Sequence, residues 1–150
     1  MTLFLIIILL GLGFIGYISY VRWRLGRALL RNVDLSQYEV YPNKMVSASA
    51  KLKAGETLGI PVKCDVLING RELHLIPVRF HPLLFMTDFP FTFVKASNKK
   101  MKPRRTEGPE ITFTGRKRKS SLYGSTFDVT IRGYDADEKR EMLKKLKAWS

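Results

Sequence analysis

The chain has 150 residues and a formal net charge of +13, with 26 Lys and Arg against 13 Asp and Glu. Every one of these charges follows residue 21, so the basic part is long enough for one compact domain and too short for two. The single cysteine, Cys64, excludes an intrachain disulfide and a cysteine-based metal cluster, and we expect it to be a small buried side chain of a strand.

Residues 3–21 form an uncharged, mostly apolar segment. At helical rise this segment crosses most of the ~30 Å hydrocarbon core of a bilayer, which predicts a transmembrane helix. A cleaved signal peptide would carry positive charge before the apolar run and small residues after it. Neither is present here, so we expect a retained anchor.

Gly11, Gly13 and Gly16 spell G-x-G-x-x-G, the letters of a dinucleotide-binding turn. That motif binds a pyrophosphate only between a strand and a helix of a βαβ unit. Apolar residues continue to Val21 and no βαβ pattern follows, which argues against a nucleotide site.

Aromatic and basic residues follow the end of the span, and we interpret residues 22–42 as a basic juxtamembrane helix or a plain linker. Because the Lys and Arg excess lies on the C-terminal side, the positive-inside rule places the N-terminus outside and residues 22–150 in the cytoplasm, at an inner or plasma membrane. The expected membrane-interface anchors are Tyr17, Tyr20, Arg22, Trp23, Arg24 and Arg27.

Residues 43–150 are expected to form the cytoplasmic β-domain, and from Met45 onward the apolar positions alternate with a period of two, which indicates strands. Asn69-Gly70 between two alternating runs is a strong hairpin signal, and the short connections favour antiparallel pairing. The apolar positions predict about six or seven strands, in the runs 46–52, 60–68, 73–80, 89–93, 111–113 and 127–131.

One amphipathic helix is predicted over residues 135–149. Asp135 can cap it, with Glu138 completing a capping box. The stripe formed by Met142, Leu143, Leu146 and Trp149 would pack on the sheet.

This order of elements resembles the pleckstrin-homology-like (PH/GRAM-like) superfold, over residues 43–150 and ending in the helix GYDADEKREMLKKLKAW. The resemblance implies a mainly antiparallel, bent β-barrel closed at one end by the C-terminal helix. Lipid-binding members carry a basic cluster between their first two strands, where this chain has only Lys51, Lys53 and Glu56. Phosphoinositide recognition therefore does not transfer. An α+β sheet capped by one helix is the alternative fold.

Residues 95–119 hold ten Lys and Arg against Glu107 and Glu110. Three interpretations stay open: a solvated loop, attachment to anionic lipid, or a dock for an acidic protein or nucleic acid. Nucleic acid is the less favoured partner because Phe113 is the only aromatic residue in this interval, and single-strand binding needs stacking platforms. The candidate binding residues are Lys99, Lys100, Lys102, Arg104, Arg105, Arg116, Lys117, Arg118 and Lys119.

Catalytic chemistry is difficult to assemble from this sequence. We expect His74 to be exposed, because it points away from its leucine neighbours, and Asp88 is a lone acid without a second positioned group. No metal-ligand spacing and no phosphate-binding loop is present, so we expect no catalytic residue, metal or cofactor and no small-molecule partner.

These features predict a single-pass, membrane-anchored binding or scaffold protein that presents a basic domain at the cytoplasmic membrane face. Its expected partners are anionic lipid headgroups and a protein. The alternative is a small structural subunit of a multi-protein membrane complex. A nucleic-acid-binding module or an enzyme fits the sequence less well.

Overall fold

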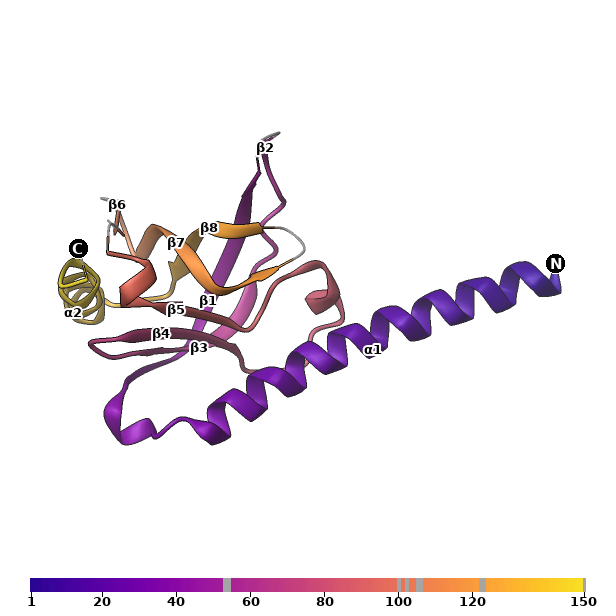
Figure 1. The fold of residues 1–150 in the computed structure, drawn as a ribbon, viewed down its shortest axis with the longest axis horizontal. Helices are drawn as coiled ribbons and strands as arrows, with labels where there is room; N and C mark the ends of the chain where they lie inside the picture. The colour runs from indigo at the N-terminus through magenta and orange to yellow at the C-terminus, as the bar shows by residue number, and fades with distance from the viewer. Residues whose placement is uncertain (53–54, 100, 102, 105–106, 122–123, 150) are drawn as a thin grey trace.

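The structure, a computed structural model, describes residues 1–52, 55–99, 101, 103–104, 107–121 and 124–149. A long apolar helix, an antiparallel sheet and a C-terminal helix follow one another, which confirms the expected fold class (Figure 1). The helices are α1 (Thr2–Asn32) and α2 (Ala136–Lys147), and the short 3₁₀ turns are η1 (Leu35–Gln37), η2 (Pro82–Met86) and η3 (Lys95–Ser97). The strands are β1 (Glu39–Leu52), β2 (Gly55–Glu56), β3 (Val62–Ile68), β4 (Glu72–Pro77), β5 (Phe91–Val94), β6 (Pro103–Arg104), β7 (Glu110–Ser121) and β8 (Gly124–Arg132).

The main strands form a ring because β1 is long enough to pair on both sides. Its first part pairs with β3 and its later part with β8, as in Val40 opposite Leu67 and Ala48 opposite Val129. Around the ring the order is β1, β3, β4, β5, β7, β8 and back to β1, and each pairing is antiparallel. The β1–β3 register shifts next to Asn43, whose φ of 56° lies in the left-handed region that asparagine tolerates.

Among the described residues, the ring has its fewest strand-to-strand residue pairs between β5 and β7. Within the described residues, their backbone pairing consists of Phe93 opposite Lys117. The buried side chain of Asn98 supplies further bonds there: its Nδ2 donates to the carbonyls of Val94 (2.9 Å) and Arg116 (3.0 Å), and its Oδ1 accepts from the Arg116 amide (2.6 Å). Asn98 therefore takes the place of missing strand-to-strand hydrogen bonds.

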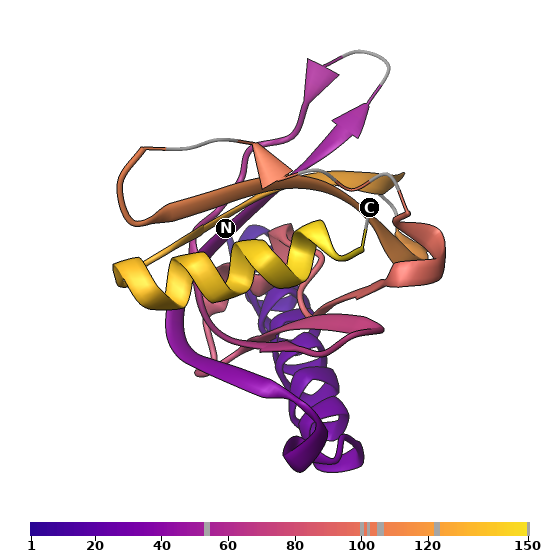
Figure 2. The same ribbon diagram turned by 90° about the vertical axis from the view of Figure 1, so that its left-hand side faces the viewer.

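Helix α2 lies across one end of the ring and completes its core (Figure 2). Its apolar stripe is buried at Met142, Leu146 and Trp149, where it meets the phenylalanine-rich interior. The predicted capping box is present: the Asp135 side chain accepts from the Glu138 amide at 2.8 Å, and the Glu138 carboxylate accepts from the Asp135 amide at 3.1 Å.

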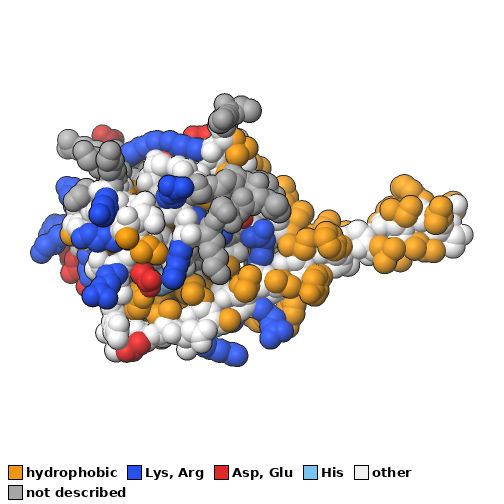
Figure 3. All heavy atoms as spheres, viewed as in Figure 1, with side chains coloured by type: hydrophobic (Ala, Val, Ile, Leu, Met, Phe, Trp, Pro, Cys, Tyr) orange, Lys and Arg blue, Asp and Glu red, His pale blue; other side chains and the backbone are white. Residues whose placement is uncertain are grey.

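Helix α1 is one continuous helix with two different surroundings. Residues 1–14 are exposed and extend away from the sheet, and partial burial begins at Ile15 (Figures 1 and 3). The later half packs on η2 and β4, so residues 22–32 continue α1 along the domain. Gly26 permits this close approach, because a Cβ at that position would lie 3.3 Å from Ile76 Cγ2 and 3.5 Å from Pro77 Cδ. The sheet then begins at Glu39, ahead of Met45, where the alternating pattern starts.

The expectation that His74 is exposed is wrong, because only 2% of its surface is accessible. Alternation along β4 does place the His74 side chain on the other face of the sheet from Leu73 and Leu75, but that outer face is also covered. Helix α1 packs against Ile76 there, and the Tyr38 ring lies 5.4 Å from the imidazole. Strands β3 and β4 are thus buried on both faces over much of their length.

Candidate functional site

The junction between α1 and the sheet brings charged side chains together at the point where the uncharged part of α1 ends. Arg22, on α1, places its Nη1 3.6 Å from Oδ1 of Asp88, which lies in the connection between β4 and β5. The Asp88 side chain is only 3% exposed and that of Arg22 is 20% exposed. The second carboxylate oxygen, Asp88 Oδ2, and the Arg22 Nε are buried without a hydrogen-bond partner among the described residues.

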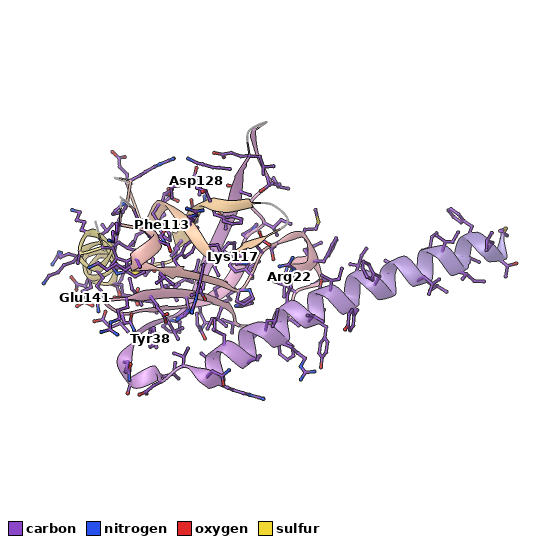
Figure 4. All side chains as sticks on the ribbon, in the orientation of Figure 1. Arg22, Tyr38, Phe113, Lys117, Asp128 and Glu141 are labelled. Carbon is purple, nitrogen blue, oxygen red and sulfur yellow. The ribbon has the colours of Figure 1, made fainter. Side chains whose placement is uncertain are left out.

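Lys117 adds a second cation to this junction from β7, next to Arg22 (Figure 4). Its Nζ donates to the backbone carbonyl of Asp88 at 2.6 Å and lies 4.9 Å from the centre of the Phe91 ring. Burial lowers the pKa of Lys117; the neighbouring charge of Arg22 adds to this, and Asp88 opposes it. Burial is therefore the main cause of the lowered pKa, and the ammonium group lies in a partly dry position between Asp88 and Arg22.

A cavity of about 430 Å³ opens at this junction. One part of its wall is cationic, formed by Arg22, Lys117 and Arg118, and Asp88 is the acid that accompanies them. The remaining wall is mostly apolar and is formed by Leu25, Leu29, Phe89 and Pro90, with Thr92. An arrangement of this kind suits an amphiphile that carries a negative group next to a hydrocarbon part.

Arg118 connects the cavity to a small polar cluster on the outer face of the sheet. Its Nη1 lies 3.7 Å from Oε1 of Glu72, and Oε2 of Glu72 accepts from the Tyr38 hydroxyl at 2.9 Å and lies 3.2 Å from His74 Nε2. His74 Nδ1 lies 3.0 Å from the Thr92 hydroxyl. Burial lowers the pKa of His74, and Glu72 opposes that effect.

The candidate basic residues of 95–119 do not form one stripe among those that the structure describes. Lys117 and Arg118 lie at the α1 junction, whereas Arg104 lies on β6 near α2, 3.5 Å from Asp128. Lys99 and Arg116 are exposed. Lys100, Lys102 and Arg105 lie outside the described residues, as does the side chain of Lys119.

The expected membrane-interface anchors fall into two groups, one exposed on α1 and one in contact with the domain. Tyr17, Tyr20 and Arg24 are exposed on α1. Trp23 packs against the core of the domain, and Arg27 Nη2 donates to the carbonyls of Pro77, at 3.0 Å, and Val78. Together with Arg22, these residues join α1 to the sheet.

Sequence reasoning missed the junction because its members come from separate segments. The signal that could have found it is the loss of alternation in β3 and β4, where Leu67 and Ile76 are apolar at positions expected to face solvent. Such runs indicate a strand covered on both faces. At Ile76 of β4 the cover is α1.

No protein-family model matches this chain, and no curated protein matches it either. Within the described part of the chain, no group of three or more His, Cys, Asp and Glu side chains is placed to hold a metal ion. Helix α1 is long and apolar enough to cross a membrane.

Proposed function

We propose that this chain is a single-pass membrane protein whose basic β-domain binds anionic lipid headgroups at the cytoplasmic membrane face. The junction cavity carries the proposal, because three cations and an apolar wall meet beside the end of the uncharged segment of α1. A lipid phosphate would accept hydrogen bonds from Lys117 and Arg118, while the first carbons of its chains pack on Leu25 and Leu29. A pleckstrin-homology-like fold is part of this proposal, supported by the strand ring and the position of α2.

The rigid connection between anchor and domain supports this proposal. Because α1 runs without interruption from its exposed apolar half onto the sheet, the domain has little freedom to move away from a membrane that α1 crosses. Lys117 and Arg118 then stay near the headgroups at high effective concentration. Strand β6, which contains Arg104, lies near α2, at the end of the molecule opposite the free half of α1 (Figure 1), so Arg104 is less suited to contact the same bilayer.

Lipid binding is tested on the full-length protein in detergent, by native mass spectrometry with added phosphatidylglycerol or phosphatidylcholine. We expect phosphatidylglycerol to be retained preferentially. A double variant, Lys117→Gln with Arg118→Gln, should bind it roughly thirtyfold more weakly, since each cation near a lipid surface contributes about 1 kcal/mol.

The matched control removes two exposed charges away from the cavity, with Lys63→Gln and Arg140→Gln. Equal retention by the two double variants would rule out the cavity as the headgroup site. The subunit alternative is tested by gentle extraction from native membranes and sizing, where a stoichiometric protein partner would favour it. A reporter that is active only in the cytoplasm, fused to the C-terminus, tests the orientation.

A further inference from the structure

The connection between β4 and β5 contains an apolar segment, residues 80–87, with the sequence FHPLLFMT. Three of its large apolar side chains are exposed: Phe80 at 47%, Leu83 at 40% and Met86 at 45%. The segment contains no Asp, Glu, Lys or Arg. Single exposed apolar residues are ordinary, but a cluster of them next to an apolar helix marks an interaction surface.

The depth of this segment is fixed by its contact with α1. The Ser19 hydroxyl donates to the carbonyl of Pro82 at 2.7 Å and accepts from the amide of Phe85 at 3.1 Å. Ser19 is fully buried by this contact and lies within the uncharged part of α1. Whatever depth Ser19 has in a membrane, segment 80–87 shares it.

The free part of α1 is too short to cross a bilayer by itself. From Leu3 to Phe14 every residue of the helix is exposed, and that stretch is about 18 Å long at helical rise. A hydrocarbon core is ~30 Å thick, so the turns from Ile15 onward must supply the remaining depth. Those turns are the ones against which η2 packs.

Charged residues border both apolar stretches. Arg22 is the first charged residue of α1, Arg79 and Asp88 flank segment 80–87, and Arg22 pairs with Asp88. Charged groups at the edge of a hydrocarbon region are expected to be paired in this way.

The backbone of the segment is also suited to a place with little water. Pro82 has no amide hydrogen, and the amides of Leu83, Leu84, Phe85 and Thr87 all have partners within the protein. Irregular backbone is tolerated at membrane depth only when its polar groups are satisfied in this manner.

We propose that segment 80–87 enters the bilayer beside α1, with Phe80, Leu83 and Met86 in contact with lipid at the boundary of headgroups and acyl chains. The inference rests on the proposed function, because it requires that α1 crosses the membrane. Segment 80–87 is then a second lipid-contacting element beside α1. The domain contacts the membrane surface directly through it and is not separated from the bilayer by a linker.

The test uses spin-labelled full-length protein in lipid vesicles. Cys64, the only cysteine, is first replaced by alanine, and a nitroxide is placed in turn at Leu83→Cys and Met86→Cys. Leu9→Cys labels the free part of α1. Leu35→Cys is the matched control, since this exposed leucine lies beyond the opposite end of α1. Power-saturation measurements then compare relaxation by oxygen, which enters lipid, with relaxation by a water-soluble nickel chelate.

At positions 83 and 86 we expect the ratio of oxygen to nickel accessibility to approach that of Leu9 and to exceed that of Leu35 severalfold. A lipid-like Leu9 label with water-like labels at both 83 and 86 would overturn the inference and leave the anchor intact. A water-like label at Leu9 would overturn the anchor, and the inference with it. The two labelled positions guard against one variant that does not fold.

Discussion

Arg22 Nη1 lies 3.6 Å from Asp88 Oδ1, and this ion pair joins helix α1 to the connection between β4 and β5. The two residues are distant in sequence, and the Asp88 carboxylate is almost completely buried. The pair therefore joins α1 to the domain through a contact between distant parts of the chain.

Removing only Arg22 should destabilise the domain, because it takes the ion-pair partner from the buried Asp88 carboxylate and leaves only the nearby ammonium group of Lys117. For Arg22→Gln we expect a loss of about 3 kcal/mol in the free energy of unfolding. The double variant Arg22→Gln with Asp88→Asn should recover part of that loss. Denaturant unfolding in detergent, followed by tryptophan fluorescence, measures both. An Arg22→Gln variant as stable as the exposed-site variant Arg140→Gln would show that the pair contributes little.

A bulky side chain at Gly26 should separate α1 from the sheet. Gly26→Leu would push a side chain into Ile76 and Pro77, whereas Gly13→Leu enters open space and is the matched control. Limited proteolysis of residues 33–38 should become faster in Gly26→Leu alone, because the packed helix no longer protects this connection. Equal cleavage of the two variants would contradict the docked position of α1.

Stability should fall on acidification because of His74. Burial lowers its folded pKa below the ordinary value of 6.5, while Glu72 opposes the shift and Arg118 adds to it; Tyr38 and Thr92 are its uncharged neighbours. The unfolded chain then binds the proton more readily. The contribution of His74 is therefore present above pH 6.5 and is lost as the pH falls through 6.5 toward the lowered folded pKa.

Thermal unfolding between pH 7.5 and 5 measures this effect. This interval covers about one pH unit on either side of the ordinary histidine pKa. A His74→Gln variant should show a flatter profile, and His81→Gln controls for the loss of a histidine elsewhere. A parent profile that matches that of His74→Gln would count against the expected role of His74.

Removing the Asn98 side chain should open the ring between β5 and β7. Asn98→Ala loses all three of its hydrogen bonds and leaves the part-buried carbonyls of Val94 and Arg116 without this partner. We expect about 1–3 kcal/mol of destabilisation. Hydrogen exchange should accelerate first in β5 and the adjoining part of β7, and uniform acceleration across all strands would contradict this local role.

Local patterns predicted the elements of this fold, and long-range contacts determined the site. The hairpin at Asn69-Gly70 and the capping box of Asp135 depend on neighbours within a few residues, so the sequence reports them directly. The burial of His74 depends on Tyr38, which is distant in sequence, and α1 covers the same face of the sheet at Ile76. Alternation identifies two faces of a strand but does not show which faces are covered.

The cavity shows the same limit. Leu25 and Leu29 could be interpreted as part of a juxtamembrane helix, and Lys117 as one charge in a basic run. Their common site exists because β7 and α1, which are far apart in the sequence, come together in the fold. The spacing of residues along the sequence does not show that two distant segments come together in the fold.

The bonds of Ser19 have a consequence for the order in which the protein is made. In the proposed arrangement α1 is synthesised first and reaches the membrane before its partner, segment 80–87, has been translated. Until then the Ser19 hydroxyl can bond only within its own helix, for example to the carbonyl of Ile15 one turn earlier. Exchange of that bond for the bonds to Pro82 and Phe85 would then mark the last stage of biogenesis, when a finished domain docks onto a helix already in place.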